Sequence, residues 1–133
     1  MREILFRGKR VDNGKWVEGY YCVFNDTSHR IYTGYAEKDC GEYYPDCYEV
    51  IPETVGQYTE LPDKNGRPIF EGDIVRDAET FYVGKIYFDA DTARFVIEFA
   101  SFITDFDNYN NGSIEVIGNI YDNPELIGGR NER

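Results

Sequence analysis

The chain has 133 residues, a formal net charge of −11 and an isoelectric point near 4.4. This length suits one domain, or two small lobes that share a core. Hydrophobic residues make up 41% of the sequence, which is enough for a folded protein. Because a strongly negative field repels phosphate backbones and anionic lipids, direct binding to nucleic acid or to membranes is not expected.

The composition also indicates a compartment. Residues 1–10 lack the continuous apolar run of an export signal, and no stretch is long enough to span a membrane as a helix. Three cysteines in a chain without such a signal favour reduced thiols over a disulfide framework. We therefore expect a cytoplasmic protein.

The first predicted element is a β-hairpin over residues 3–24. Asp12–Lys15 is its turn, because Asn and Gly tolerate a positive φ. The second strand covers Trp16–Phe24, and Gly19 inside it marks a bulge or a point of close approach.

The sequence signals for strands and turns are weaker after residue 24. A polar turn is predicted at Asn25–Ser28 and a short strand at Arg30–Tyr35. Residues 36–47 mix acids, Gly, Cys and Pro without a period, so we expect a loop there. Pro52, which cannot donate to a ladder, separates two extended segments: Tyr48–Ile51 and Val55–Thr59.

The second half of the chain also contains predicted strands separated by predicted turns. Asp63–Gly66 is a turn, and four strands are expected after it: Ile74–Arg76, Phe81–Phe88 with Gly84 inside it, Arg94–Phe99 and Ser113–Ile120. Polar turns are expected at Asp89–Ala93 and Asp105–Gly112. Asn123–Leu126 is typical of a helix start, with Asn as the N-cap and Pro at the first helical position, and Gly128 and Gly129 end it.

Short strands with frequent turn signals, and no apolar period of 3.6 residues, indicate an all-β fold, either a small barrel or a sandwich. We expect a small antiparallel barrel in the second half, an N-terminal β-meander and one short C-terminal helical turn. The domain would span residues 1–133, with two candidate lobes at 1–60 and 61–133.

Five stretches resemble the YopX-like family of phage and prophage proteins: Ile4–Arg10, Gly14–Tyr21, Val55–Val75, Val83–Phe88 and Ile114–Ile127. The resemblance implies a largely β protein with an SH3-like barrel that self-associates in a bacterial host. It implies no activity and no functional residue. The region Asn25–Cys47 carries no motif of the family, and its role stays open.

Four residues raise the question of a zinc site: Cys22, His29, Cys40 and Cys47. Thiolate and imidazole are the preferred zinc ligands, but these spacings lack the close Cys pair that organises such a site. Cys22 lies in an apolar strand, where a free Cys behaves as a small hydrophobe. A catalytic Cys–His pair lacks a third residue to orient the imidazole. The sequence predicts neither site.

Paired carboxylates are the other candidates: Asp89 with Asp91, Asp105 with Asp107, and Glu71 with Asp73. The first two pairs lack the Gly and Glu positions of an EF-hand loop, so we interpret them as turn formers. For the third pair, Gly72 permits a sharp turn and Asp73 is expected to bind neighbouring backbone N–H groups. We predict no catalytic, cofactor-binding or metal-binding residues.

Tyrosines crowd the first half of the chain: Tyr20, Tyr21, Tyr32, Tyr35, Tyr43, Tyr44 and Tyr48. A groove that stacks bases normally includes Lys and Arg, whereas acids surround these rings: Glu37, Asp39, Glu42, Asp46 and Glu49. We expect half or more of the rings to lie in the core. Any exposed ones favour a protein interface within Tyr35–Tyr48.

The sequence therefore favours a non-enzymatic accessory protein that acts through protein–protein contacts and forms a homo-oligomer. One alternative is an acidic DNA mimic that binds a basic nucleic-acid-binding protein. Another is a small hydrolase that uses carboxylates near Gly72 or the thiols of Cys40 and Cys47, which would need a pocket with convergent titratable groups.

Overall fold

The computed structural model describes residues 4–37, 41, 43–110 and 112–127. The backbone is mostly β-strand, with one four-residue α-helix and two short 3-10 helices in these ranges. The chain divides into two compact units, residues 1–58 and 59–133, and the boundary falls within β5 (Gly56–Pro62). No helix in the described part of the chain is long and apolar enough to cross a membrane.

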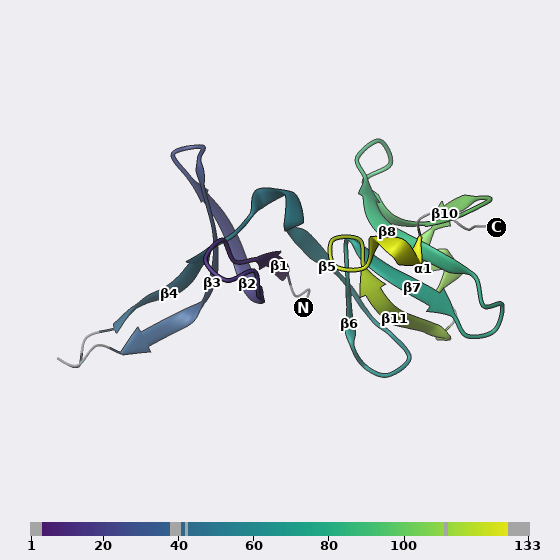
Figure 1. Ribbon diagram of the computed structural model, residues 1–133, viewed down its shortest axis with the longest axis horizontal. Helices are drawn as coiled ribbons and strands as arrows, with labels where there is room; N and C mark the ends of the chain where they lie inside the picture. The colour runs from purple at the N-terminus through teal and green to yellow at the C-terminus, as the bar shows by residue number, and fades with distance from the viewer. Residues whose placement is uncertain (1–3, 38–40, 42, 111, 128–133) are drawn as a thin grey trace. The chain divides into compact units, whose positions relative to one another are not determined.

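Antiparallel strands in chain order make up the first unit (Figure 1). The strands are β1 (Phe6–Lys9), β2 (Trp16–Phe24), β3 (Ser28–Glu37) and β4 (Tyr43–Glu49). The beginning of β5 pairs with β1, after a 3-10 turn at Pro52–Thr54. The predicted hairpin over residues 3–24 is confirmed, since β1 and β2 pair antiparallel.

Gly19 is a point of close approach, as the sequence indicated. A Cβ atom at this position would lie 2.1 Å from the carbonyl oxygen of Tyr32, which no side chain can tolerate without movement of β3. Ile31 is buried beside it. Ile31 and Val50, which is also buried, form the apolar centre of the first unit. Gly8 leaves room for both of them.

The predicted loop over residues 36–47 is wrong for much of its length. β3 continues to Glu37, β4 begins at Tyr43, and these two residues face each other across the hairpin. β4 is the end strand of its sheet, so Pro45 is tolerated there. An end strand held by cross-strand pairing needs no apolar period, which is why the sequence pattern did not show it.

The second unit contains the end of β5, β6 (Pro68–Phe70) and a five-stranded antiparallel sheet (Figure 1). The sheet has the order β10-β9-β8-β7-β11. Its strands are β7 (Asp73–Asp77), β8 (Val83–Asp89), β9 (Arg94–Phe99), β10 (Ile103–Asp105) and β11 (Ile114–Asn119). The core cluster is Ile69, Val75, Ile86, Ile97, Phe99, Phe106, Ile114 and Val116.

The predicted all-β class is confirmed, and a 3-10 turn at Pro124–Leu126 gives the expected C-terminal helical turn. Both sheets are open, however: the described strands form no closed barrel. β10 and β11 lie at opposite ends of the five-strand order. The connection between them contains α1 (Phe106–Tyr109), whose Phe106 is 1% exposed and fills the core.

Two local predictions need correction. Asp105–Gly112 is not only a turn, because Asp105 caps α1 by accepting a hydrogen bond from the Asn108 amide at 3.3 Å. Asn123 precedes Pro124 as expected but does not cap with its side chain. Its Oδ1 accepts from the Asn119 amide instead, at 3.2 Å. Gly128 and Gly129 lie outside the described residues.

Candidate functional site

Asp77 is a buried carboxylate at the end of β7. It is 1% exposed and accepts hydrogen bonds from the hydroxyls of Tyr109 at 2.6 Å and Ser113 at 2.7 Å, and from the Glu79 amide at 2.9 Å. Burial alone raises the pKa of Asp77, but these hydrogen bonds outweigh it and the pKa lies below its usual value. Asp77 is therefore ionised, and its hydrogen bonds connect the turn after β7 to α1 and to Ser113, just before β11.

Asp63 has a similar role in the turn between β5 and β6. Its Oδ1 accepts from the amides of Asn65 and Arg67 at 2.8 and 2.9 Å, and its Oδ2 accepts from the Val116 amide at 3.0 Å. Burial opposes ionisation, yet the backbone donors lower the pKa of Asp63 overall. The predicted turn is confirmed, and its first residue also anchors that turn to β11.

The carboxylates around Gly72 behave as the turn interpretation predicts. Asp73 is 1% exposed and its Oδ2 accepts from the Phe70 amide at 2.8 Å. Gly72 has a φ of +94°, a conformation that favours glycine. Glu71 is half-buried. The geometry assigns Asp73 to the turn, where its side chain orders the backbone before β7.

Among the described candidate zinc ligands, Cys22 and Cys47 lie on one face of the sheet and His29 on the other. Cys22 pairs with Arg30 and Val23 pairs with His29, so Cys22 and His29 project from opposite faces of the ribbon. The Nδ1 atom of His29 shares a hydrogen bond with the Tyr21 hydroxyl at 2.6 Å. Cys40 lies outside the described residues, within which no group of three metal-ligating side chains occurs.

Cys22 itself is exposed rather than packed as a small hydrophobe. The sequence places it in an apolar strand, but residues 20–24 of β2 pair only with β3, and the Cys22 side chain on one face of this segment stays exposed.

The first aspartate of each pair forms hydrogen bonds within its own segment. Asp89 accepts from the Asp91 amide at 3.1 Å and from the Thr92 hydroxyl at 3.0 Å. Asp105 caps α1 and lies 3.9 Å from the Arg94 side chain. The turn-former interpretation is confirmed for Asp89, whereas Asp105 is a helix cap at the end of β10.

Exposed aromatic side chains are the conspicuous feature of the first unit. Tyr20 is 68% exposed and Phe24 is 42% exposed. The register places them, with Cys22, on the same face as Tyr32 and Cys47. We call these five residues the Tyr20 face. Phe24 and Tyr32 contact edge to face, with ring centroids 6.3 Å apart.

The expectation that half or more of these tyrosines lie in the core is wrong for the described ones. Tyr21, Tyr32 and Tyr48 are half-buried and Tyr20 is exposed, while the buried cores consist of Ile, Val and Phe. The side chains of Tyr35, Tyr43 and Tyr44 lie outside the described part of the structure, so an interface within Tyr35–Tyr48 stays a prediction.

The second unit carries an aromatic surface that the sequence did not single out. Phe81 is 73% exposed, Tyr82 51%, Phe102 39% and Ile103 55%. We call these four residues the Phe81 surface. Phe81 and Tyr82 come from the β7–β8 connection, Phe102 comes from the β9–β10 connection, and Ile103 is the first residue of β10. The two connections lie at the same end of the sheet because Gly84 pairs with Phe99.

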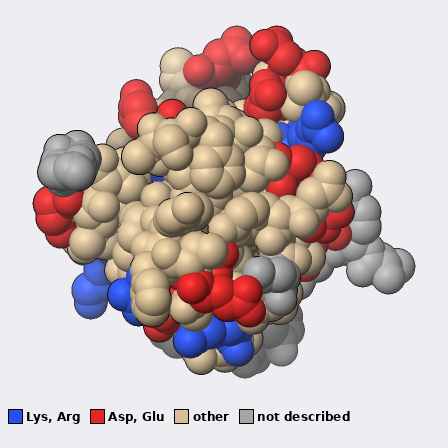
Figure 2. Space-filling model, turned by 90° about the vertical axis from the view of Figure 1, so that its right-hand side faces the viewer, with Lys and Arg blue, Asp and Glu red and all other residues tan. Residues whose placement is uncertain are grey.

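The aromatic rings of the Phe81 surface contact further rings inside the second unit. Tyr82 lies 6.2 Å from Phe102 and 5.7 Å from Phe99 between ring centroids. Phe99 is 4.8 Å from Phe102 and 5.1 Å from Tyr109. Figure 2 looks from the side on which β10 lies in Figure 1, and uncharged atoms fill the middle of that view, with carboxylates and fewer basic groups around them. The apolar run over residues 99–103, interrupted only by Ser101, was the available sequence signal.

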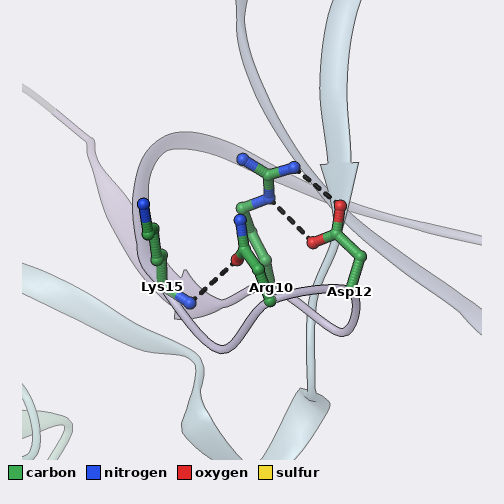
Figure 3. Close-up of polar contacts among 4 residues, drawn as sticks. Arg10, Asp12 and Lys15 are labelled. Carbon is green, nitrogen blue, oxygen red and sulfur yellow. Dashed lines mark hydrogen bonds and ion pairs between the residues drawn. The ribbon is translucent and has the colours of Figure 1, made fainter.

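In the first unit, Arg10 contacts both an aromatic ring and a carboxylate. The Arg10 guanidinium lies 4.0 Å from the centre of the Tyr48 ring. It donates to both oxygens of Asp12, at 3.0 and 2.7 Å (Figure 3). The hydrogen bonds from Arg10 lower the pKa of Asp12. Arg7 similarly lies over the Trp16 ring at 4.6 Å.

A family model described as YopX protein matches residues 5–128. The chain belongs to the YopX family. The YopX match covers both compact units and includes the Tyr20 face and the Phe81 surface. A similar solved structure is the crystal structure of protein EF1440 from Enterococcus faecalis. The TM-score is 0.64 and the sequence identity 26%, over 95% of this YopX-family chain and 99% of the other. No curated protein sequence matches.

Proposed function

We propose that this YopX-family protein is a non-enzymatic accessory protein of phage or prophage origin. It acts in the bacterial cytoplasm through protein–protein contacts and forms a homo-oligomer through the Tyr20 face. The observation that supports this is the exposure of Tyr20, Cys22 and Phe24 side by side on one face of a β-ribbon.

Residues 20–24 of β2 have several exposed apolar side chains. Residues 16–19 of β2 pair with β1, whereas residues 20–24 pair only with β3. Val23, on the face opposite Tyr20, is 42% exposed as well. Ile31, also on the face opposite Tyr20, is buried, so the Tyr20 face is the side that a partner can still cover. Burial of aromatic area by a partner contributes about 25 cal/mol per Å².

The charges on this face favour a second copy as the partner. Arg30 and Glu49 are register partners next to the aromatic residues, so the face carries both signs. The rest of the molecule is strongly acidic, since the net charge is −11. Two copies therefore repel least when they approach through the Tyr20 face, and a self-complementary contact closes as a two-fold dimer.

The test is sedimentation velocity over a range of protein concentrations. The unmodified protein is expected to sediment as an oligomer, and the double variant Tyr20→Ser/Phe24→Ser as a monomer. Phe88→Ser is the matched control, because Phe88 is also 42% exposed but belongs to the second unit. A monomer at every concentration for the unmodified protein, or an oligomer that the double variant retains, would overturn the proposal.

A further inference from the structure

Phe81 occupies a backbone conformation that bulky residues avoid. Its φ is +65°, in the left-handed region that costs about 1–2 kcal/mol for a residue with a Cβ atom. This conformation leaves the ring 73% exposed, so packing within the second unit does not explain it. A strained residue that presents a large apolar ring to solvent points to a contact with another molecule.

The surrounding structure fixes this conformation. The Phe81 amide donates to the Asp77 carbonyl at 2.7 Å, and the Asp77 amide donates to the Tyr82 carbonyl at 2.9 Å. The Asp77 carboxylate then binds the Tyr109 and Ser113 hydroxyls. The rigid turn therefore presents the rings of Phe81 and Tyr82 in advance, which lowers the entropy cost of binding.

The charge around these rings is negative. Residues 78–82 and 99–110 contain Glu79, Asp105 and Asp107 but no Lys or Arg. Asp105 faces Arg94 at 3.9 Å. Glu79 is exposed in the β7–β8 connection, and Asp107 is exposed in α1. Exposed rings with carboxylates nearby attract a cation, because the face of an aromatic ring is itself electron-rich.

Arg10 in the first unit indicates which cation fits a site made of an aromatic ring and a carboxylate. Arg10 is placed over the Tyr48 ring. It is also paired with the Asp12 carboxylate through two hydrogen bonds (Figure 3). A planar guanidinium can stack and form paired hydrogen bonds at once, which an ammonium group cannot. We propose that the Phe81 surface binds an arginine-containing segment of a partner protein, with a guanidinium stacked on its rings.

This contact is separate from self-association, which uses the Tyr20 face of the first unit. A second copy is a poor occupant of the Phe81 surface on charge grounds. Residues 59–133 contain 15 acidic and 7 basic residues, so two such units repel when they meet face to face.

The experiment uses the full chain and fluorescein-labelled peptides in which Arg, Lys or Glu alternates with Gly. Binding is followed by fluorescence anisotropy at low salt and at physiological salt. We expect the arginine peptide to bind more tightly than the lysine peptide and the glutamate peptide not to bind. Phe81→Asn should weaken arginine-peptide binding about threefold to thirtyfold, as expected for the loss of one cation–π contact.

Asn is chosen at position 81 because it tolerates a positive φ, so the turn survives the change. Phe88→Ala removes a half-exposed ring from β8 and should leave peptide binding unchanged. Three results would overturn the proposal: no binding at low salt, equal affinity of the lysine and arginine peptides for the unmodified protein, or full arginine-peptide binding by Phe81→Asn. A fourth is an oligomer that Phe81→Asn dissociates, which would assign this surface to a second copy.

Discussion

Buried aspartates determine the conformation of the turns in the second unit. Asp77 and Asp63 are both nearly inaccessible, and both keep a pKa below the usual value because several donors converge on each carboxylate. The donors to Asp77 are Tyr109, Ser113 and the Glu79 amide, and those to Asp63 are backbone amides. A hydrogen bond to a charged acceptor contributes about 1.5–3 kcal/mol, so each carboxylate matters more for the free energy of unfolding than a surface acid does.

The first prediction concerns the pH dependence of Asp77. Its folded pKa lies below the unfolded value of about 3.9, so its contribution is complete above that value. The contribution is lost as the pH falls through the folded pKa, because the unfolded chain takes up the proton first. Asp77→Asn should therefore be destabilised by about 1.5–3 kcal/mol at neutral pH, with a difference from the unmodified protein that shrinks in acid.

Urea unfolding at a series of pH values measures both effects. Glu79→Gln is the control, since it changes an exposed acid on the same turn. A difference between Asp77→Asn and the unmodified protein that stays constant down to the most acidic pH would contradict this role of Asp77.

At the scale of elements, the β5–β6 turn is fastened to β11. Asp63 Oδ2 accepts from the Val116 amide, and the Lys64 amide donates to the Ile114 carbonyl at 2.8 Å. A strand at the end of a sheet has unpaired backbone groups, and this turn supplies partners for some of those on β11. The turn therefore stabilises a sheet edge as well as reversing the chain.

We predict that Asp63→Ala loosens β11. The Val116 amide, which is buried, loses its acceptor, and an unsatisfied group of this kind costs about 1–3 kcal/mol. Amide hydrogen exchange should become faster at Val116 and Arg67 and stay slow in β8. Lys64→Ala, which leaves the Asp63 carboxylate and its backbone donors in place, should behave like the unmodified protein. Unchanged protection of Val116 in Asp63→Ala would refute the anchoring role.

The sequence predicted most elements because their signals are local. Turn residues such as Asn13, Gly14 and Gly66 are readable from their conformational preferences, and Arg94–Phe99 matches β9 at both ends. β4 was missed because it is held by pairing with β3 rather than by an apolar stripe. The exposure of Phe81 and Tyr20 was not readable either, because whether an aromatic ring packs inward depends on strand register and on the turns around it.

At the scale of the whole molecule, charge and exposed aromatic residues are distributed unevenly. Residues 59–133 carry 15 of the 25 acidic residues, and the Phe81 surface belongs to that part of the chain. The Tyr20 face belongs to the first unit and has charges of both signs beside it, Arg30 and Glu49. This distribution allows one protein to contact a second copy through one unit and a cationic partner through the other.

The central claim is that the Tyr20 face is covered by a second copy in solution. The most direct measurement is amide hydrogen exchange at low and at high protein concentration, compared residue by residue. Self-association predicts slower exchange at high concentration within residues 20–24 and 28–32, and no change in β7, β8 or β9. Exchange in these two segments that is the same at both concentrations would contradict the account.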